Sequence, residues 1–267
     1  MNKNIGTHQF KKRFGQNFLI DENILNKIIN YSKADKETLV IEVGVGSGNL
    51  TKKIAGIAKH VVGYEIDLTL KPILNEVLKE DMNVTLIFDD FLKRDLKKDI
   101  DKIECNQIFV IANLPYYITT PIITKFIEED IDIDKMIIMV QKEVGERLNA
   151  KPNTKNYNSL TVFINYFFDV TKLFDVSKNV FIPKPNVDSA VIQLKKKEKR
   201  EYLRNKQLFF KLIRDAFQYK RKTIKNNLKD YDLNIIEGVL SKYNLDLSAR
   251  AEQITIEQFI DIANNLK

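Results

Sequence analysis

The sequence predicts a doubly wound parallel α/β sheet followed by a smaller C-terminal helical domain. Short apolar runs typical of buried strands alternate with helical patterns from residue 38 to residue 149. Polar or glycine residues follow the strands where each one ends. From Asn205 onward only helical patterns follow. We therefore expect one large domain over residues 1–200 and a helical domain over residues 201–267.

Each element has its own signal. Asp21 caps a predicted helix over residues 22–32, and the proline of Thr120-Pro121 suits the first turn of another. The predicted strands of the alternating region are 38–43, 61–66, 84–88, 108–112 and 135–141. The helices expected after them are 50–58, 69–79, 120–127 and 143–149. Beyond these, residues 159–168 are predicted as an aromatic-rich strand and residues 187–194 as the last strand.

Composition excludes several classes of site. The chain has 267 residues, of which 44% are hydrophobic, and no apolar run reaches the length of a membrane span. With one cysteine, Cys105, and two histidines, the sequence argues against disulfides, a zinc site and a Ser-His-Asp triad. No signal-peptide core is recognisable near the start. We expect a cytoplasmic, monomeric protein with no metal ion and no membrane partner.

Positive charge is concentrated in one segment. Between Lys195 and Lys229 there are fourteen Lys or Arg residues and three acids, a local charge of +11. The whole chain carries +7, which leaves −4 for the remainder. A basic segment on a mildly acidic body favours a polyanion-binding surface, with a solvated helix face as the alternative.

The segment Asn113-Leu114-Pro115-Tyr116 follows a predicted buried strand. Pro115 stiffens it, the Asn113 side chain and the backbone of Leu114 or Pro115 offer carbonyl acceptors, and Tyr116 offers a flat ring. These groups suit a planar base with an exocyclic amine. Phe181, between apolar residues and braced by two prolines, is predicted to supply the opposite stacking face or to pack in the core.

A glycine loop with the spacing Gly44-x-Gly46-x-Gly48 follows the first strand of the alternating region. It differs from the dinucleotide fingerprint, and we expect the charge of Glu42 to disfavour a pyrophosphate. Glu65 and Asp90, at the ends of the next two strands, are predicted to accept hydrogen bonds from ribose hydroxyls and from an adenine amine. The set indicates a Rossmann-like methyltransferase sheet that binds S-adenosylmethionine. The reaction would be an in-line methyl transfer to an adenine that has left its stack.

The chain resembles the bacterial small-subunit (16S) ribosomal RNA adenine dimethyltransferases. The stretches that match this family are Phe14–Leu19, Glu42–Gly48, Asn113–Thr119, Val140–Val144, Phe181–Val191, Lys220–Thr223, Asn226–Leu228 and Arg250–Glu252, with Phe259. The resemblance implies dimethylation of two adjacent adenines near the 3′ end of that RNA, in an immature ribosomal particle. The chain departs from the family at Lys184 and Asn186, where proline and lysine are usual, and at Asn158, where glycine is usual.

The resemblance also implies positions for the ligands. The cofactor contacts fall on Asn17, Leu19, Gly44, Gly46, Glu65, Asp90 and Asn113. The RNA contacts are expected at Arg147, Lys220, Arg221, Lys222 and Arg250. Three alternatives stay open: a large-subunit rRNA methyltransferase that confers macrolide resistance, a non-catalytic RNA-binding assembly factor, and a DNA adenine methyltransferase.

Overall fold

The computed structural model describes residues 10–11 and 14–266. The chain forms two compact units. The larger unit runs up to Gly145 and resumes over Thr171–Lys195, and the smaller unit comprises Glu146–Val170 and the chain from Lys196 onward. The predicted boundary at residue 200 lies close to Lys195–Lys196, where the chain passes from the larger to the smaller unit for the last time. The prediction, however, assigned residues 146–170 to the larger domain. Among the described residues, no helix is long and apolar enough to cross a membrane.

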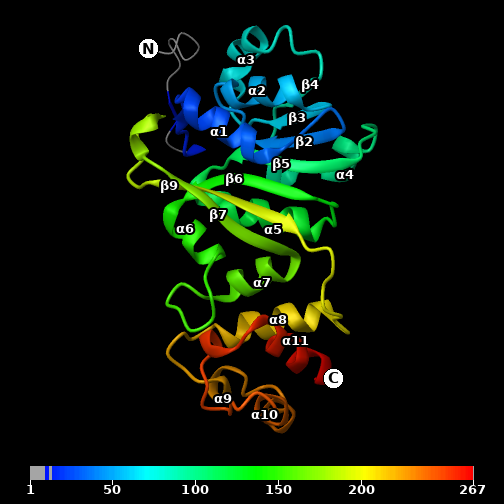
Figure 1. Ribbon diagram of the computed structural model, residues 1–267, viewed down its shortest axis with the longest axis vertical. Helices are drawn as coiled ribbons and strands as arrows, with labels where there is room; N and C mark the ends of the chain where they lie inside the picture. The colour runs from blue at the N-terminus through cyan, green and yellow to red at the C-terminus, as the bar shows by residue number, and fades with distance from the viewer. Residues whose placement is uncertain (1–9, 12–13, 267) are drawn as a thin grey trace. The chain divides into compact units, whose positions relative to one another are not determined.

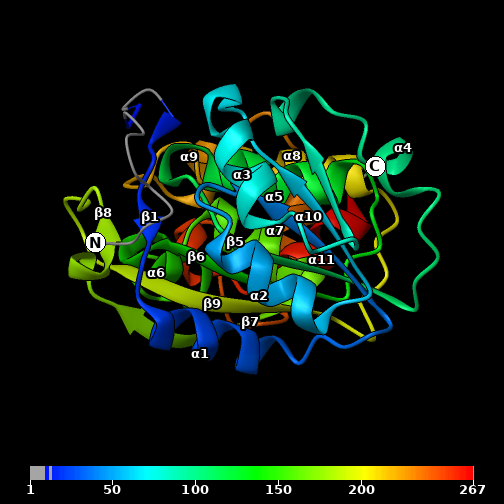
Figure 2. The same cartoon turned by 90° about the horizontal axis from the view of Figure 1, so that it is seen from above.

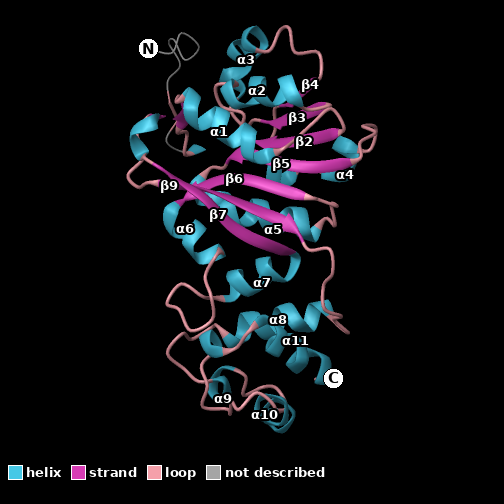
Figure 3. Cartoon of the chain, viewed as in Figure 1, coloured by secondary structure: helices cyan, strands magenta, loops and turns pink. Residues whose placement is uncertain are grey.

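A seven-stranded sheet organises the larger unit, with the strand order β4-β3-β2-β5-β6-β9-β7 (Figures 1 and 3). Strands β2 to β6 pair in parallel, and β9 pairs antiparallel to β6. The predicted strands are confirmed to within two residues, except 159–168. Their bounds are β2 Thr38–Val43, β3 His60–Tyr64, β4 Val84–Ile87, β5 Gln107–Asn113, β6 Lys135–Gln141, β7 Phe168–Val176 and β9 Ser189–Lys196.

Helices cover both faces of this sheet, because its central strands are apolar on both sides. Figure 2 shows α1 and α2 on one face and α4 and α5 on the other. Side chains of α1 and α2 share one hydrophobic cluster with Val40, Phe109 and Ile111. On the opposite face, Phe91 packs between Tyr64 of β3 and Phe126 of α5. The helices are α1 Glu22–Ser32, α2 Asn49–Ile57, α3 Lys71–Val77, α4 Leu96–Ile100, α5 Thr119–Glu128 and α6 Lys142–Leu148.

A short two-stranded sheet joins distant parts of the larger unit. Strand β1 (Phe18–Leu19) pairs antiparallel with β8 (Phe181–Ile182), and the Ile20 N–H donates to the Val180 carbonyl at 3.1 Å. The pairing holds the segment that precedes α1 against the proline-rich segment 181–186.

One predicted strand is wrong: residues 159–167 form helix α7 (Ser159–Phe167). The β-branched and aromatic residues of this segment favoured a strand. Its start is nevertheless capped, because the Asn158 side chain accepts from the Leu160 and Thr161 N–H groups and Thr161 completes a capping box. Asn158, which departs from the family pattern, is therefore the N-cap.

The smaller unit is built from helices around its own core. Phe209, Leu212 and Phe259 lie at the centre of its buried cluster, together with Tyr157, whose hydroxyl donates to the Ile254 carbonyl at 3.0 Å. Besides α7, its helices are α8 Lys206–Ala216, α9 Ile224–Asn227, α10 Leu233–Ser241 and α11 Ile256–Asn265. The helix predicted to begin near Thr255 is confirmed, with that residue as its N-cap.

Candidate active site

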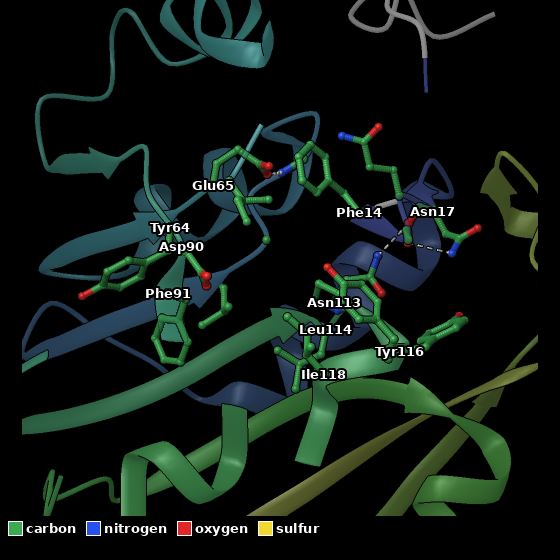
Figure 4. A pocket seen from close by; sticks show the side chains of 18 of the residues that line it. Phe14, Asn17, Tyr64, Glu65, Asp90, Phe91, Asn113, Leu114, Tyr116 and Ile118 are labelled. Carbon is green, nitrogen blue, oxygen red and sulfur yellow. Dashed lines mark hydrogen bonds between the residues drawn. The ribbon is translucent and has the colours of Figure 1, made fainter. Parts of the chain in front are cut away.

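A cavity lies at the carboxyl ends of β2, β3 and β5 (Figure 4), where ligands of parallel sheets are usually bound. Five short segments line it. They contribute residues 14–18, Val43 with Gly44 and Gly46, and residues 64–66, 89–92 and 113–118. The structure therefore brings together Gly44, Gly46, Glu65, Asp90 and the segment Asn113–Tyr116, whose strand ends the sequence predicted to form one site, and adds Asn17, which only the family resemblance implied.

The glycine loop forms one wall of the cavity. Gly44 and Gly46 have φ angles of 82° and 60°, a region that side chains other than glycine rarely adopt. A Cβ atom on Gly46 would lie 3.0 Å from the ring of Phe18. The backbone conformation therefore favours glycine at both positions, and the Phe18 ring leaves no room for a side chain on Gly46.

Glu65 is the acidic group of this wall and is 6% exposed. Its Oε2 accepts from the Gly46 N–H and its Oε1 accepts from the Asp67 N–H, both at 2.8 Å. Burial raises the pKa of Glu65, while the backbone hydrogen bonds oppose this shift. Each carboxylate oxygen keeps a further lone pair. The side chain is therefore fixed and still able to accept from hydroxyl groups of a ligand.

Asp90 follows β4 and is half-buried. Its Oδ1 accepts from the Leu92 N–H at 3.0 Å and caps a 3₁₀ helix over Phe91–Lys93. The Lys93 ammonium lies 3.8 Å from its Oδ2. The carboxylate is thus held at the cavity by the turn that it caps.

The Asn113 side chain is oriented by the segment that precedes α1. Its Nδ2 donates to the Asn17 carbonyl at 2.9 Å (Figure 4). A backbone carbonyl can only accept, so the amide group must turn its NH₂ toward Asn17. The Oδ1 atom is consequently the part of Asn113 that is left to accept from a ligand.

The backbone acceptors beside Asn113 differ in availability. The Pro115 carbonyl already accepts from the Ile118 N–H at 3.2 Å and from the Thr119 hydroxyl at 3.3 Å. The Leu114 carbonyl receives no hydrogen bond from the described residues. Leu114 rather than Pro115 is therefore the better second acceptor, a choice that the sequence left open.

Tyr116 is held at its hydroxyl end, because its OH lies 2.5 Å from Oγ of the buried Ser189. Burial also raises the pKa of Tyr116, so the phenol stays neutral. The sequence reasoning missed its neighbour Tyr117, which is 56% exposed and lines the same cavity. The close approach of the Tyr117 ring to Gly15, where a Cβ would lie 3.0 Å away, gave no signal in the sequence.

A polar clasp on Asp67 holds Lys11 and Gln16, and Gln16 belongs to the residues 14–18 that line the cavity. Asp67, 1% exposed, accepts from Lys11 Nζ at 2.6 Å and from Gln16 Nε2 at 2.8 Å. Burial alone would raise the pKa of Asp67, but the hydrogen bonds from Lys11, Thr69 and Gln16 outweigh it and lower the pKa. The clasp therefore persists at neutral pH, and it places Asn17 where its carbonyl meets Asn113.

Leu19 and Phe181 lie outside the cavity lining. They face each other in the β1–β8 pair, are 5% and 3% exposed, and belong to one hydrophobic cluster. The structure thus places Phe181 in the core, the second of the two interpretations that its sequence allowed.

The expected charge of Glu42 needs correction. Its side chain is 1% exposed, and burial raises the pKa of Glu42 to about 8. Its Oε2 atom has no hydrogen-bond partner among the described residues. The group is mainly protonated at neutral pH, so negative charge on Glu42 is not what disfavours a pyrophosphate.

All five predicted RNA-binding cations belong to the smaller unit, and each is exposed. Lys220 donates to the Lys155 carbonyl at 2.7 Å, whereas Arg221 and Lys222 form no side-chain hydrogen bond or ion pair with the described residues. Asn227, 8% exposed, donates to the Ala216 carbonyl at 2.7 Å and so fixes the turn that carries these cations. Arg147 and Arg250 complete the set. Within residues 10–11 and 14–266 there is no group of three His, Cys, Asp or Glu residues arranged for a metal ion.

Comparisons with known proteins extend over nearly the whole chain. A family model described as ribosomal RNA adenine dimethylase matches residues 7–267. A ribosomal RNA small subunit methyltransferase A from Bacillus pumilus (strain SAFR-032) is 44% identical, covering 97% of this chain and 91% of that protein. A protein of the same name from Staphylococcus aureus (strain N315) is 43% identical, with coverages of 97% and 90%.

Two solved structures are similar in fold. A dimethyladenosine transferase from Plasmodium falciparum has a TM-score of 0.78 and 27% identity, covering 92% of this chain and 95% of that one. A 23S rRNA methyltransferase, ErmE, has a TM-score of 0.72 and 24% identity, with coverages of 94% and 99%. The second likeness concerns the fold alone.

Proposed function

Because the chain belongs to the ribosomal RNA adenine dimethylase family, we propose that it transfers methyl groups from S-adenosylmethionine to N6 of two adjacent adenines. The targets lie near the 3′ end of small-subunit (16S) rRNA, and each becomes N6,N6-dimethyladenosine. The names of the relatives from Bacillus and Staphylococcus support the small subunit as the substrate. The observation that carries the proposal is the orientation of the Asn113 amide by Asn17.

The cavity fits the cofactor. Gly44 and Gly46 line the cavity with backbone alone, and Glu65 can accept from the two ribose hydroxyls. Asp90 accepts from the adenine amine, and Asn17 lies at the opposite wall. Leu19 contributes at most through its backbone, since its side chain is buried in the core. S-adenosylmethionine, when bound, supplies a methyl group already activated by its sulfonium.

The acceptor side of the site is built from carbonyl oxygens. An adenine N6 lone pair is delocalised into the ring, which makes it a weak nucleophile. The Asn113 Oδ1 and the Leu114 carbonyl accept the two N6–H bonds and draw the nitrogen toward tetrahedral geometry. As positive charge develops on N6 these hydrogen bonds strengthen, so they stabilise the transition state more than the bound substrate.

Tyr116 supplies a stacking face for the flipped base, with its hydroxyl held by Ser189. Pro115 keeps this segment stiff. Phe181 is proposed to cover the opposite face of the base, which requires its ring to leave the hydrophobic cluster when RNA binds. A Phe181→Leu variant, which keeps an apolar side chain in the core, should then slow methyl transfer while cofactor affinity stays unchanged.

The smaller unit is proposed to bind the RNA backbone through Arg147, Lys220, Arg221, Lys222 and Arg250. Their positive charges neutralise phosphates, which supply most of the affinity of such complexes. The substrate is proposed to be an immature ribosomal particle, and the enzyme to act as a monomer.

Mass spectrometry of rRNA tests this function. Unmethylated small and large ribosomal subunits are incubated separately with the protein and isotope-labelled S-adenosylmethionine. We expect label as dimethyladenosine at two adjacent positions of the small-subunit RNA, and label that appears on the order of a hundredfold more slowly, or slower still, with Asn113→Ala. Label on large-subunit RNA would instead support a macrolide-resistance methyltransferase. Tight binding of small subunits without any label would support a non-catalytic assembly factor.

A further inference from the structure

A second cavity of about 500 Å³ adjoins the first within the larger unit. Gly15, Gln16, Asn17 and Tyr116 line both cavities, so these residues form the wall between them. The remaining lining comes from Phe10, Lys11, Gln141 and the segment Pro183–Val187. Of the groups assigned above to the cofactor, only Asn17 also lines this second cavity.

The groups that hold the target amine face only the first cavity. Asn113 and Leu114 line the first cavity and are absent from the lining of the second. A base held by these two acceptors therefore lies on the first-cavity side of Tyr116. Whatever occupies the second cavity lies next to that base, across the Tyr116 residue.

The second cavity carries unused hydrogen-bonding groups. The Gln141 side chain is half-buried at the end of β6, and the Asn186 side chain is exposed on the proline-rich segment. Neither amide group forms a side-chain hydrogen bond with the described residues, and the Lys184 ammonium has no such partner either. The Asn186 backbone, by contrast, is held, because its carbonyl accepts from Lys178 Nζ at 3.3 Å.

These groups match the chemistry of one nucleotide. An asparagine or glutamine amide can pair with the adjacent donor and acceptor of adenine, N6 and N7. Single-stranded RNA exposes that edge, which makes it readable by a protein. An ammonium group suits a phosphate oxygen. Pro183 and Pro185 add an apolar surface for a base.

We propose that the second cavity binds the nucleotide adjacent to the target adenine. Gln141 and Asn186 read the edge of its base, and Lys184 contacts its phosphate. This inference rests on the proposed function and sharpens it, because an adenine is then required in both cavities at once. When the first of the two is modified, the pair of adjacent adenines is therefore one recognition unit, of which one member is methylated while the other, still bearing its N6–H groups, is read.

The test compares two substrates that differ only at the neighbouring base. Unmethylated small subunits carry either both adenines or a guanine in place of one, and methylation of the fixed adenine is followed by mass spectrometry. The variants are Gln141→Ala and, as a control, Lys97→Ala, an exposed cation on α4 outside both cavities. Affinity for the demethylated cofactor reports whether each variant is folded.

We expect the wild type and Lys97→Ala to prefer the adenine neighbour by about five- to a hundredfold in kcat/KM. Gln141→Ala should lose that preference and methylate both substrates at the lower rate. An equal loss on both substrates would make Gln141 a structural residue and overturn the inference, as would a wild type without preference. If the wild type methylates neither substrate, the proposed function itself fails, which is a different result.

Lys184→Ala tests the phosphate contact independently. Removing one phosphate contact to a single strand should lower the log–log salt slope of RNA binding by about 0.7. Lys97→Ala should leave the slope unchanged. An unchanged slope in Lys184→Ala would remove the phosphate from the second cavity and contradict this part of the assignment.

Discussion

Replacing Asn113 with alanine tests the residue to which we assign the central role in methyl transfer. The substitution removes the Oδ1 acceptor and also the 2.9 Å hydrogen bond from Nδ2 to the Asn17 carbonyl. Loss of one preorganised polar contact to a developing charge lowers turnover by on the order of a hundredfold or more. Loss of the Asn17 hydrogen bond costs about 1 kcal/mol, which is about fivefold in cofactor affinity if residues 14–17 loosen.

Asn17→Ala is the matched control, because Asn113 contacts the backbone carbonyl of Asn17 and not its side chain. This variant keeps the orienting hydrogen bond and removes only the 3.0 Å hydrogen bond from Asn17 Nδ2 to the Gly15 carbonyl. We therefore expect Asn17→Ala to weaken cofactor binding and to leave turnover at saturation near that of the wild type.

Single-turnover kinetics at saturating RNA and cofactor measure the step of interest, and thermal melting checks that each variant is folded. RNA affinity should change little in Asn113→Ala, since phosphates supply most of it. A folded Asn113→Ala protein that methylates at the wild-type rate would refute the reasoning, and Tyr116 would then be a structural residue.

Three further predictions concern the cofactor, the RNA and pH. Glu65→Ala should weaken S-adenosylmethionine binding by about 1.5–3 kcal/mol in calorimetry, because a charged acceptor of hydroxyl groups is removed; unchanged affinity would exclude the ribose contact. The double variant Arg221→Ala, Lys222→Ala should lower the salt slope of RNA binding by about 0.7–0.9 for each phosphate that is no longer neutralised, whereas an unchanged slope would assign both to a solvated surface. Finally, burial raises the pKa of Glu42 from 4.5 to about 8 in the folded protein, so only the folded state keeps this proton between those values. The proton on Glu42 therefore contributes most to the free energy of unfolding at low pH. This contribution falls by up to about 4 kcal/mol as pH rises from about 5 to 8. Denaturant unfolding of the wild type should show this fall relative to Glu42→Gln, and parallel pH profiles would contradict it.

The parallel strands β2 to β6 and the groups at their ends were predictable from the sequence, whereas β1, β7 and β8 were not predicted. Apolar runs such as Thr38–Val43 identify buried parallel strands, and chain order alone places Gly44, Glu65 and Asn113 at one edge of the sheet. Local signals suffice here, because strand burial and parallel connection leave few alternatives. The helix α1 was equally predictable from its cap at Asp21.

Features that depend on distant contacts were not predictable. The clasp of Lys11 and Gln16 on Asp67 joins residues more than fifty positions apart, and no local sequence pattern predicts it. The pairing of Leu19 with Phe181, which lie far apart in the sequence, was not predictable, and without it the sequence left the stacking and core interpretations of Phe181 undecided. Helix α7 was missed because its aromatic and β-branched content outweighed the capping signal at Asn158.

The β1–β8 pair links the cavity proposed for S-adenosylmethionine with the one proposed for RNA. Residues just before β1 line the first cavity, where we propose that the cofactor binds, and residues just after β8 line the second cavity, so one backbone ladder connects both. A ligand that orders either strand lowers the entropic cost of ordering the other. Such coupling is reciprocal. If bound RNA raises the affinity for S-adenosylmethionine by some factor, bound S-adenosylmethionine must raise the affinity for RNA by the same factor. RNA affinity can therefore be compared with S-adenosylmethionine bound and with its demethylated product bound. A lower affinity with the product would favour dissociation of the modified RNA.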